Sequence, residues 1–130
     1  MFLSAFNQEE RLAFLILSNH FMELSDNRDL SEQILAGFRN EMNIEGSRPL
    51  PNWNFEDCAE KFYKPESKAK ALIELIGFGH IDSNYSVEES EFVKKLALSF
   101  CIDENKLVEM ENWVFRMNSL INEVNHFWED

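Results

Sequence analysis

Residues 69–100, AKALIELIGFGHIDSNYSVEESEFVKKLALSF, decide the fold. Apolar residues recur at helical spacing on both sides of its centre, from Leu72 to Phe78 before it and from Phe92 to Phe100 after it. The eight residues between these runs, Asp82 to Glu89, are mostly polar, acidic and turn-forming. The segment therefore predicts two apolar-striped helices joined by an acidic turn.

A second copy of this plan lies 56 residues upstream. Ala13, Ile16 and Leu17 match Ala69, Leu72 and Ile73, Asp26 matches Asp82, and Glu32 matches Glu88. Self-similarity at a fixed spacing indicates that one supersecondary unit occurs twice. We therefore expect an internal pseudo-twofold repeat of helix, acidic turn and helix.

Capping and turn residues place the other elements. In the first half we expect a helix over about 8–24 that begins with an Asn7–Glu10 capping box, a second helix to about Asn43, and a loop over 44–54 that contains Gly46, Pro49 and Pro51. In the second half we expect a short helix to Tyr63 capped by Asn54 and Asp57, a helix from Pro65, and a helix from a Ser86–Glu89 capping box to about Cys101.

The last helix, expected over about 103–128, has the most regular pattern in the chain. Its apolar residues are spaced 3, 4, 3, 4, 3, 4: Leu107, Met110, Val114, Met117, Ile121, Val124 and Trp128. Such an a/d seam suits a dimeric coiled coil, but three heptads are few, and packing across the bundle is the commoner use in a chain with five other helices. We favour intramolecular packing, with Trp113 partly buried beside the core.

The sequence thus predicts an all-α, single-domain bundle of about six helices, because no useful strand-like alternation is present. The domain spans 1–130, with the first repeat over about 8–43, a loop and short helix over 44–64, the second repeat over about 65–101, and the last helix. A chain of 130 residues is long enough to bury a core of its own.

The chain is acidic, with 24 Asp and Glu against 12 Lys and Arg and a net charge of −12. This balance disfavours nucleic acid and anionic lipid surfaces, and leaves cations or basic protein surfaces as counterparts. We expect buried free thiols at Cys58 and Cys101, no membrane insertion and a cytoplasmic location. The expected partner is an unidentified protein, and the chain itself is expected to be a monomer or weak homodimer.

The second repeat resembles the tellurite-resistance TerB-like family. The likeness lies in residues 71–82, ALIELIGFGHID, followed by Glu88-Glu89, and it extends through the last helix at Leu107, Glu111 and Trp113. It implies an all-α bundle with internal pseudo-symmetry, related to the N-terminal domain of DjlA-type co-chaperones, whose two acidic turns form a divalent-cation site. Here Asn27 and Ser83 replace the glycine after each aspartate, and Gln33 replaces the second glutamate of the first pair.

A cation site also follows from the repeat itself. If the two units pack about a pseudo-twofold axis, the carboxylates of Asp26, Glu32, Asp82 and Glu88 approach one another and require a cation or raised pKa values. Oxygen ligands of this kind suit Ca²⁺ or Mg²⁺. A self-contained EF-hand loop is not expected, because Val87 and Val93 occupy the positions of its glycine and bidentate glutamate.

Helix-start chemistry is the competing interpretation of the same acidic residues, and we favour it. Glu89 completes a capping box with Ser86, Glu32 has the same spacing from Asp29, and acidic residues in a first turn are stabilised by the helix dipole.

No catalytic triad, phosphate loop or Rossmann glycine pattern appears in the sequence, and the histidines have no ligand spacing. The leading hypothesis is a non-catalytic TerB-like adaptor of a stress-response system, with a metal-dependent hydrolase-like enzyme and a structural dimer through the last helix as alternatives. Trp53, Phe127 and Trp128 are candidate interaction anchors, although folding back onto the bundle is the expected outcome for them.

Overall fold

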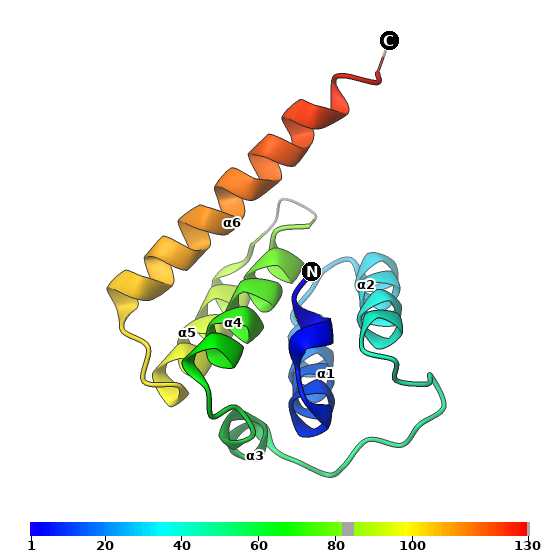
Figure 1. The fold of residues 1–130 in the computed structure, drawn as a ribbon, viewed down its shortest axis with the longest axis vertical. Helices are drawn as coiled ribbons and strands as arrows, with labels where there is room; N and C mark the ends of the chain where they lie inside the picture. The colour runs from blue at the N-terminus through cyan, green and yellow to red at the C-terminus, as the bar shows by residue number, and fades with distance from the viewer. Residues whose placement is uncertain (82–84, 130) are drawn as a thin grey trace.

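The computed structural model describes residues 1–81 and 85–129, which form six α-helices and one short 3-10 helix (Figure 1). The elements are η1 (Leu3–Ala5), α1 (Gln8–Met22), α2 (Arg28–Glu41), α3 (Phe55–Glu60), α4 (Pro65–Gly79), α5 (Val87–Ser99) and α6 (Glu104–Asn125). No strand occurs among the described residues, so the predicted all-α class is confirmed.

Local capping explains where most of these helices begin. The three predicted capping boxes are confirmed: Asn7 with Glu10 starts α1, Asn54 with Asp57 starts α3, and Ser86 with Glu89 starts α5. Pro65 occupies the first turn of α4, where its missing N–H removes no hydrogen bond.

The start of α2 differs from the prediction. Asn27 is the N-cap, and its side-chain oxygen accepts a hydrogen bond of 3.1 Å from the Leu30 N–H. Because this cap starts the helix two residues early, Asp29 lies inside the first turn and does not form a capping box with Glu32. The prediction of an Asp29–Glu32 box was wrong.

α2 and α5 end in the same way. Asn43 and Cys101, just beyond the two helices, have left-handed φ angles of 57° and 58°. The next residue in each case donates back into the helix, Ile44 N–H to the Arg39 carbonyl at 2.8 Å and Ile102 N–H to the Ala97 carbonyl at 2.9 Å. These are Schellman closures, which satisfy carbonyls that a helix end otherwise leaves without partners.

This closure corrects the prediction for one cysteine. Cys58 is buried in α3, as expected, but Cys101, the residue with the left-handed φ angle after α5, is exposed. Burial raises the pKa of the Cys58 thiol to about 12.

The two thiols should therefore differ sharply in reactivity. In the native protein we expect one thiol per chain to react rapidly with a disulfide reagent at pH 8, and two to react after unfolding in urea, because only a thiolate attacks. The measurement is the absorbance of the thiolate that the reagent releases, followed over time. The Cys101→Ser variant should lose the fast phase, and a fast phase that survives in it would contradict this assignment.

The helices pack in an interlocked order. α1 packs against α2 and α3, α4 packs against α5 and α6, and contacts of α1 with α4 and of α3 with α5 join the two groups. The core between them is apolar, and nine phenylalanine rings run through it with centroid separations of 5.2–5.7 Å: Phe100, Phe62, Phe6, Phe14, Phe38, Phe78, Phe21, Phe92 and Phe55. Trp53 folds back onto this core, as predicted, under the ammonium of Lys61.

The N-terminal residues tie α2 to α4. The Met1 amino group lies 3.1 Å from Glu41 of α2 and 3.0 Å from Glu74 of α4, and the Phe2 and Leu3 N–H groups donate to the same two carboxylates. Partial burial alone lowers the pKa of this amino group, but the hydrogen bonds and charges of Glu74 and Glu41 outweigh it and raise the pKa above 8.0.

Close packing also defines the end of α4. The Tyr85 ring stacks on His80 with the ring centroids 4.5 Å apart, and it lies so close to Gly79 that a Cβ at that glycine would be 2.5 Å from the ring. Gly77, two residues earlier on the same helix, has open space where a Cβ would stand. Glycine is therefore required at position 79 for packing, and not at position 77.

These two glycines form a matched test of the packing. Gly77→Ala should stabilise the protein by up to about 1 kcal/mol, because alanine has the higher helix propensity. Gly79→Ala should destabilise it by about 1–3 kcal/mol, because the new methyl group displaces the Tyr85 ring. Urea unfolding measures both, and changes of the same sign would contradict the described contact.

Candidate functional site

The structure describes three of the four predicted cation ligands. Asp26 is exposed in the turn before α2, and Glu32 and Glu88 are exposed in the first part of α2 and in the first turn of α5. Asp82, the fourth predicted ligand, lies outside the described residues. Within the residues that are described, no group of three His, Cys, Asp or Glu side chains is placed to hold a metal ion.

The cation site and the TerB-like acidic turns therefore stay predictions. Glu89, next to Glu88, is accounted for by capping: its carboxylate accepts from the Ser86 N–H at 2.9 Å, and its own N–H donates to the Ser86 hydroxyl at 3.1 Å.

The cation hypothesis is tested by melting the protein with and without Ca²⁺ or Mg²⁺ at constant ionic strength. If the four carboxylates share a cation, a concentration of 100 times the dissociation constant should add about 2.7 kcal/mol of stability. The double variant Asp26→Asn with Asp82→Asn should lose that gain and be more stable than wild type without metal, because carboxylate repulsion is relieved. Equal melting shifts for both proteins would exclude the site.

α6 is the element whose environment departs most from expectation. The first three seam residues, Leu107, Met110 and Val114, are buried against α4 and α5. Beyond Met117, which is half-buried, the helix leaves the other helices and runs outward to the C-terminus (Figure 1). The prediction of intramolecular packing is confirmed for the first half of the seam and wrong for the second, where Ile121, Val124 and Trp128 are exposed.

The second half of α6 carries a continuous apolar surface, which we call the projecting face. Its members and their exposed fractions are Trp113 (38%), Leu120 (60%), Ile121 (48%), Val124 (41%), Phe127 (83%) and Trp128 (69%). Spacings of three, four and seven residues place the helical members on one side. Phe127 and Trp128 follow in the turn that closes the helix and do not fold back onto the bundle, so that expectation was wrong for them.

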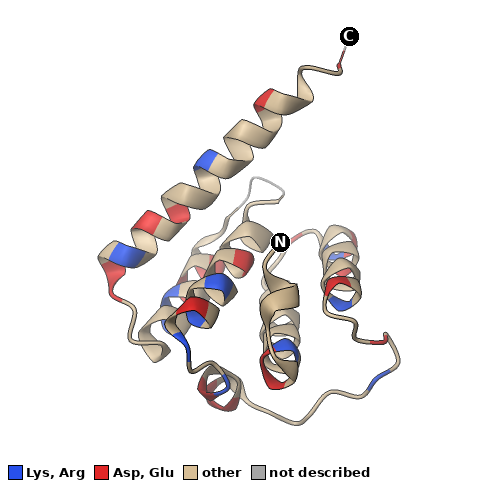
Figure 2. Ribbon diagram, in the orientation of Figure 1, with Lys and Arg blue, Asp and Glu red and all other residues tan. Residues whose placement is uncertain are grey.

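Charge is nearly absent from this part of the molecule. Residues 113–128 contain one arginine, Arg116, and one glutamate, Glu123, so their net charge is zero in a chain whose total is −12. Figure 2 shows the charged positions thinning out along the projecting half of α6, in contrast to its first turns. An apolar, uncharged helix surface in water is the composition of a protein interface core.

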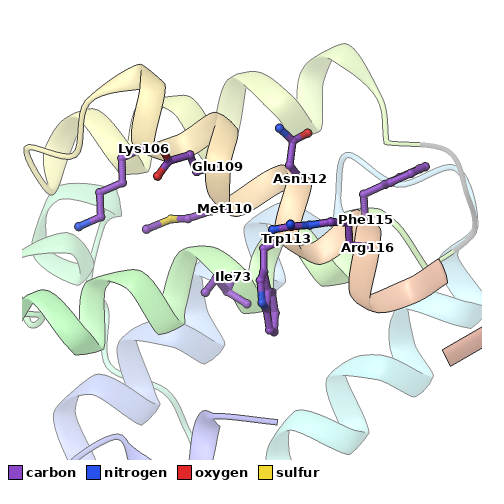
Figure 3. Close-up of a pocket in the computed structure, with 8 residues that line it drawn as sticks. All are labelled: Ile73, Lys106, Glu109, Met110, Asn112, Trp113, Phe115 and Arg116. Atoms are coloured by element: carbon purple, nitrogen blue, oxygen red, sulfur yellow. The ribbon is translucent and has the colours of Figure 1, made fainter. Parts of the chain in front are cut away.

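A shallow groove continues the projecting face toward α4. It has a volume of about 750 Å³ and is lined by Ile73 of α4 and by residues of α6 that include Lys106, Met110, Trp113 and Arg116. In Figure 3 the Trp113 indole points toward Ile73, whereas Asn112 and Phe115 point to the other side of α6. The groove therefore combines an apolar floor with charged side chains of both signs, Lys106, Arg116 and Glu109.

The chain matches no family model, no curated protein and no solved structure. The TerB-like resemblance thus remains a prediction from the sequence motifs. Among the described residues, no helix is long and apolar enough to cross a membrane.

A signal for the projecting face was present in the sequence. Trp113, Leu120 and Phe127 recur every seven residues beside the a/d seam, at positions where a helix packed only along that seam carries charged side chains. The apolar stripe is therefore wider than one a/d seam, which indicates that the helix contacts more than one packing surface.

Proposed function

We propose that the protein is a non-catalytic adaptor that binds an amphipathic helix of a protein partner through the projecting face of α6. The observation that carries this proposal is the exposure of the second half of a regular apolar seam whose first half is buried in the bundle. The apolar pattern that packs the first half of α6 onto α4 and α5 thus continues along the second half, where it is exposed and can bind a partner.

Energetics support binding at this face. Large apolar side chains gain about 25 cal/mol per Å² when they leave water, and contiguous apolar patches of this kind on soluble proteins mark interaction sites. Phe127 and Trp128 are the largest exposed members, and aromatic residues are the most frequent energetic anchors of interfaces.

The geometry favours a helix as the partner element. A surface with apolar residues at positions i, i+4, i+7 and i+11, such as Trp113, Met117, Leu120 and Val124, matches the seam of another helix. Because the face is uncharged, its complement is an apolar helix stripe and not a basic or acidic segment.

The resemblance to TerB-like proteins supplies the finer parts of the proposal. These are an internal pseudo-twofold relation of α1–α2 to α4–α5, acidic turns that are able to take up a divalent cation, and an adaptor role in a cytoplasmic stress-response system. The capping by Asn27 and Ser86 and the Schellman closures after α2 and α5 support a common plan for the two helix pairs.

A matched pair of exposed aromatic residues tests the site. We expect the photoreactive residue p-benzoylphenylalanine to give protein adducts in cells of the source organism when it replaces Phe127, and few when it replaces Tyr63, which is 69% exposed after α3 and far from α6 in the sequence. Peptide mapping should place the adduct on an amphipathic helix. Equal adducts at both positions, or none at Phe127, would contradict the proposed site.

A second matched pair tests the same surface without a crosslinker. Val124→Asp should reduce adduct formation from Phe127 by at least about tenfold, because a charge is placed in an apolar interface. Val108→Asp, with similar exposure but on another side of α6, should leave it unchanged. Circular dichroism serves to confirm that both variants keep their helices.

A further inference from the structure

We propose that the helix bound by the projecting face is α6 of a second copy of this chain, arranged antiparallel to the first. This inference rests on the proposed function, because it names the partner of the same surface. Four features carry it: the regular spacing of the face, its lack of charge, the charge order along α6, and the groove at its inner end.

The face is complementary to itself. Met117, Ile121 and Val124 continue the 3–4 seam, and Leu120 and Phe127 widen it on one side. Two helices that both carry a repeat of this period pack side chains of one between side chains of the other. The α6 helix of a second copy therefore has the period that this face requires.

The charge distribution permits two copies of an acidic protein to meet here. Of the 24 acidic and 12 basic residues, only Glu123 and Arg116 lie in 113–128, and neither occupies a seam position. Two such surfaces approach without like-charge repulsion at the interface, whereas most other surfaces of a protein with net charge −12 repel a second copy.

The order of charges along α6 favours the antiparallel arrangement. Within the projecting face, Arg116 lies toward the inner end and Glu123 toward the outer end, while Lys106, Glu109 and Glu111 lie before the face on α6. In the antiparallel arrangement, a twofold axis near Leu120, about midway between Trp113 and Trp128, places Glu123 of the second copy within about one helical turn of Arg116. Parallel pairing instead sets like charges side by side.

The groove gives the second copy's terminal aromatics a place to bind. With the axis near Leu120, Trp128 of one copy lies opposite Trp113 of the other, at the groove of about 750 Å³ that Ile73 and Met110 help to line. Phe127 and Trp128, which are 83% and 69% exposed in the single chain, are thereby covered.

The buried area fits a reversible dimer. A large aromatic side chain buries about 150–250 Å², so the exposed parts of the six members offer on the order of 600 Å² per copy. Twice this area lies at the lower end of the 1,200–2,000 Å² range of specific interfaces. We therefore expect a dissociation constant of about 1–100 µM.

Sedimentation equilibrium of the purified full chain at about 1–300 µM tests the association. The average mass should rise from 15.3 kDa toward twice that value with concentration. Leu120→Asp should weaken the association by at least about tenfold. Leu98→Asp, which makes the same change at an exposed leucine of α5, should not.

Disulfide trapping tests the orientation. On a Cys101→Ser background, a mixture of Val124→Cys and Met117→Cys proteins should form predominantly the mixed disulfide, because antiparallel helices set position 124 opposite position 117. Parallel helices would instead give the 117–117 and 124–124 products. Peptide mapping distinguishes these outcomes, and predominant homodisulfides would overturn the antiparallel arrangement.

The two proposals fail in different ways. A wild-type chain that stays monomeric at 300 µM, or an association that Leu120→Asp leaves unchanged, would overturn the dimer. If the Phe127 crosslinker then still maps to a helix of another protein, the adaptor proposal stands. If the crosslinker gives no adduct and the chain is monomeric, both proposals fall.

Discussion

The structure depends on a continuous series of phenylalanine contacts. The series starts with three rings that follow α5, α3 and η1: Phe100, Phe62 and Phe6. It continues through rings of α1, α2 and α4, returns to α1 and ends in α5 and α3, in tilted or edge-to-face pairs. Such pairs contribute about 0.5–1.5 kcal/mol each beyond the area they bury. Because consecutive rings come from different elements, the series fixes α1–α5 relative to one another.

The size of this core determines how much of α6 can pack against the bundle. α6 has 22 residues and α4, its main support, has 15, which correspond to about 33 Å and 22 Å at 1.5 Å per residue. A helix that starts beside the end of α5 therefore outruns the bundle whatever its sequence. Of the apolar residues beyond Met117, Ile121 borders a cavity that Ile81 and Tyr85 also line, and a partner from outside would bury the others.

The sequence was sufficient for those features that depend on neighbours in the chain. Helix positions, three capping boxes and the regular seam of α6 all follow from spacings of a few residues. The exposure of Cys101 and of the outer half of α6 depends on how the helices pack, which local spacing does not define. The Asn27 cap was missed because Asp29 offered a competing start within the same turn.

The contrast between an acidic body and an uncharged projecting helix has a further physical consequence. Residues 113–128 carry no net charge, so the whole −12 belongs to the rest of the chain. An antiparallel pair places the two acidic bodies at opposite ends of the paired helices, where salt screens part of their repulsion because the Debye length is about 8 Å at physiological ionic strength. A parallel pair would bring both bodies to the same end of the helices, where the repulsion is strongest. The length of α6 and the charge of the bundle thus favour the same orientation.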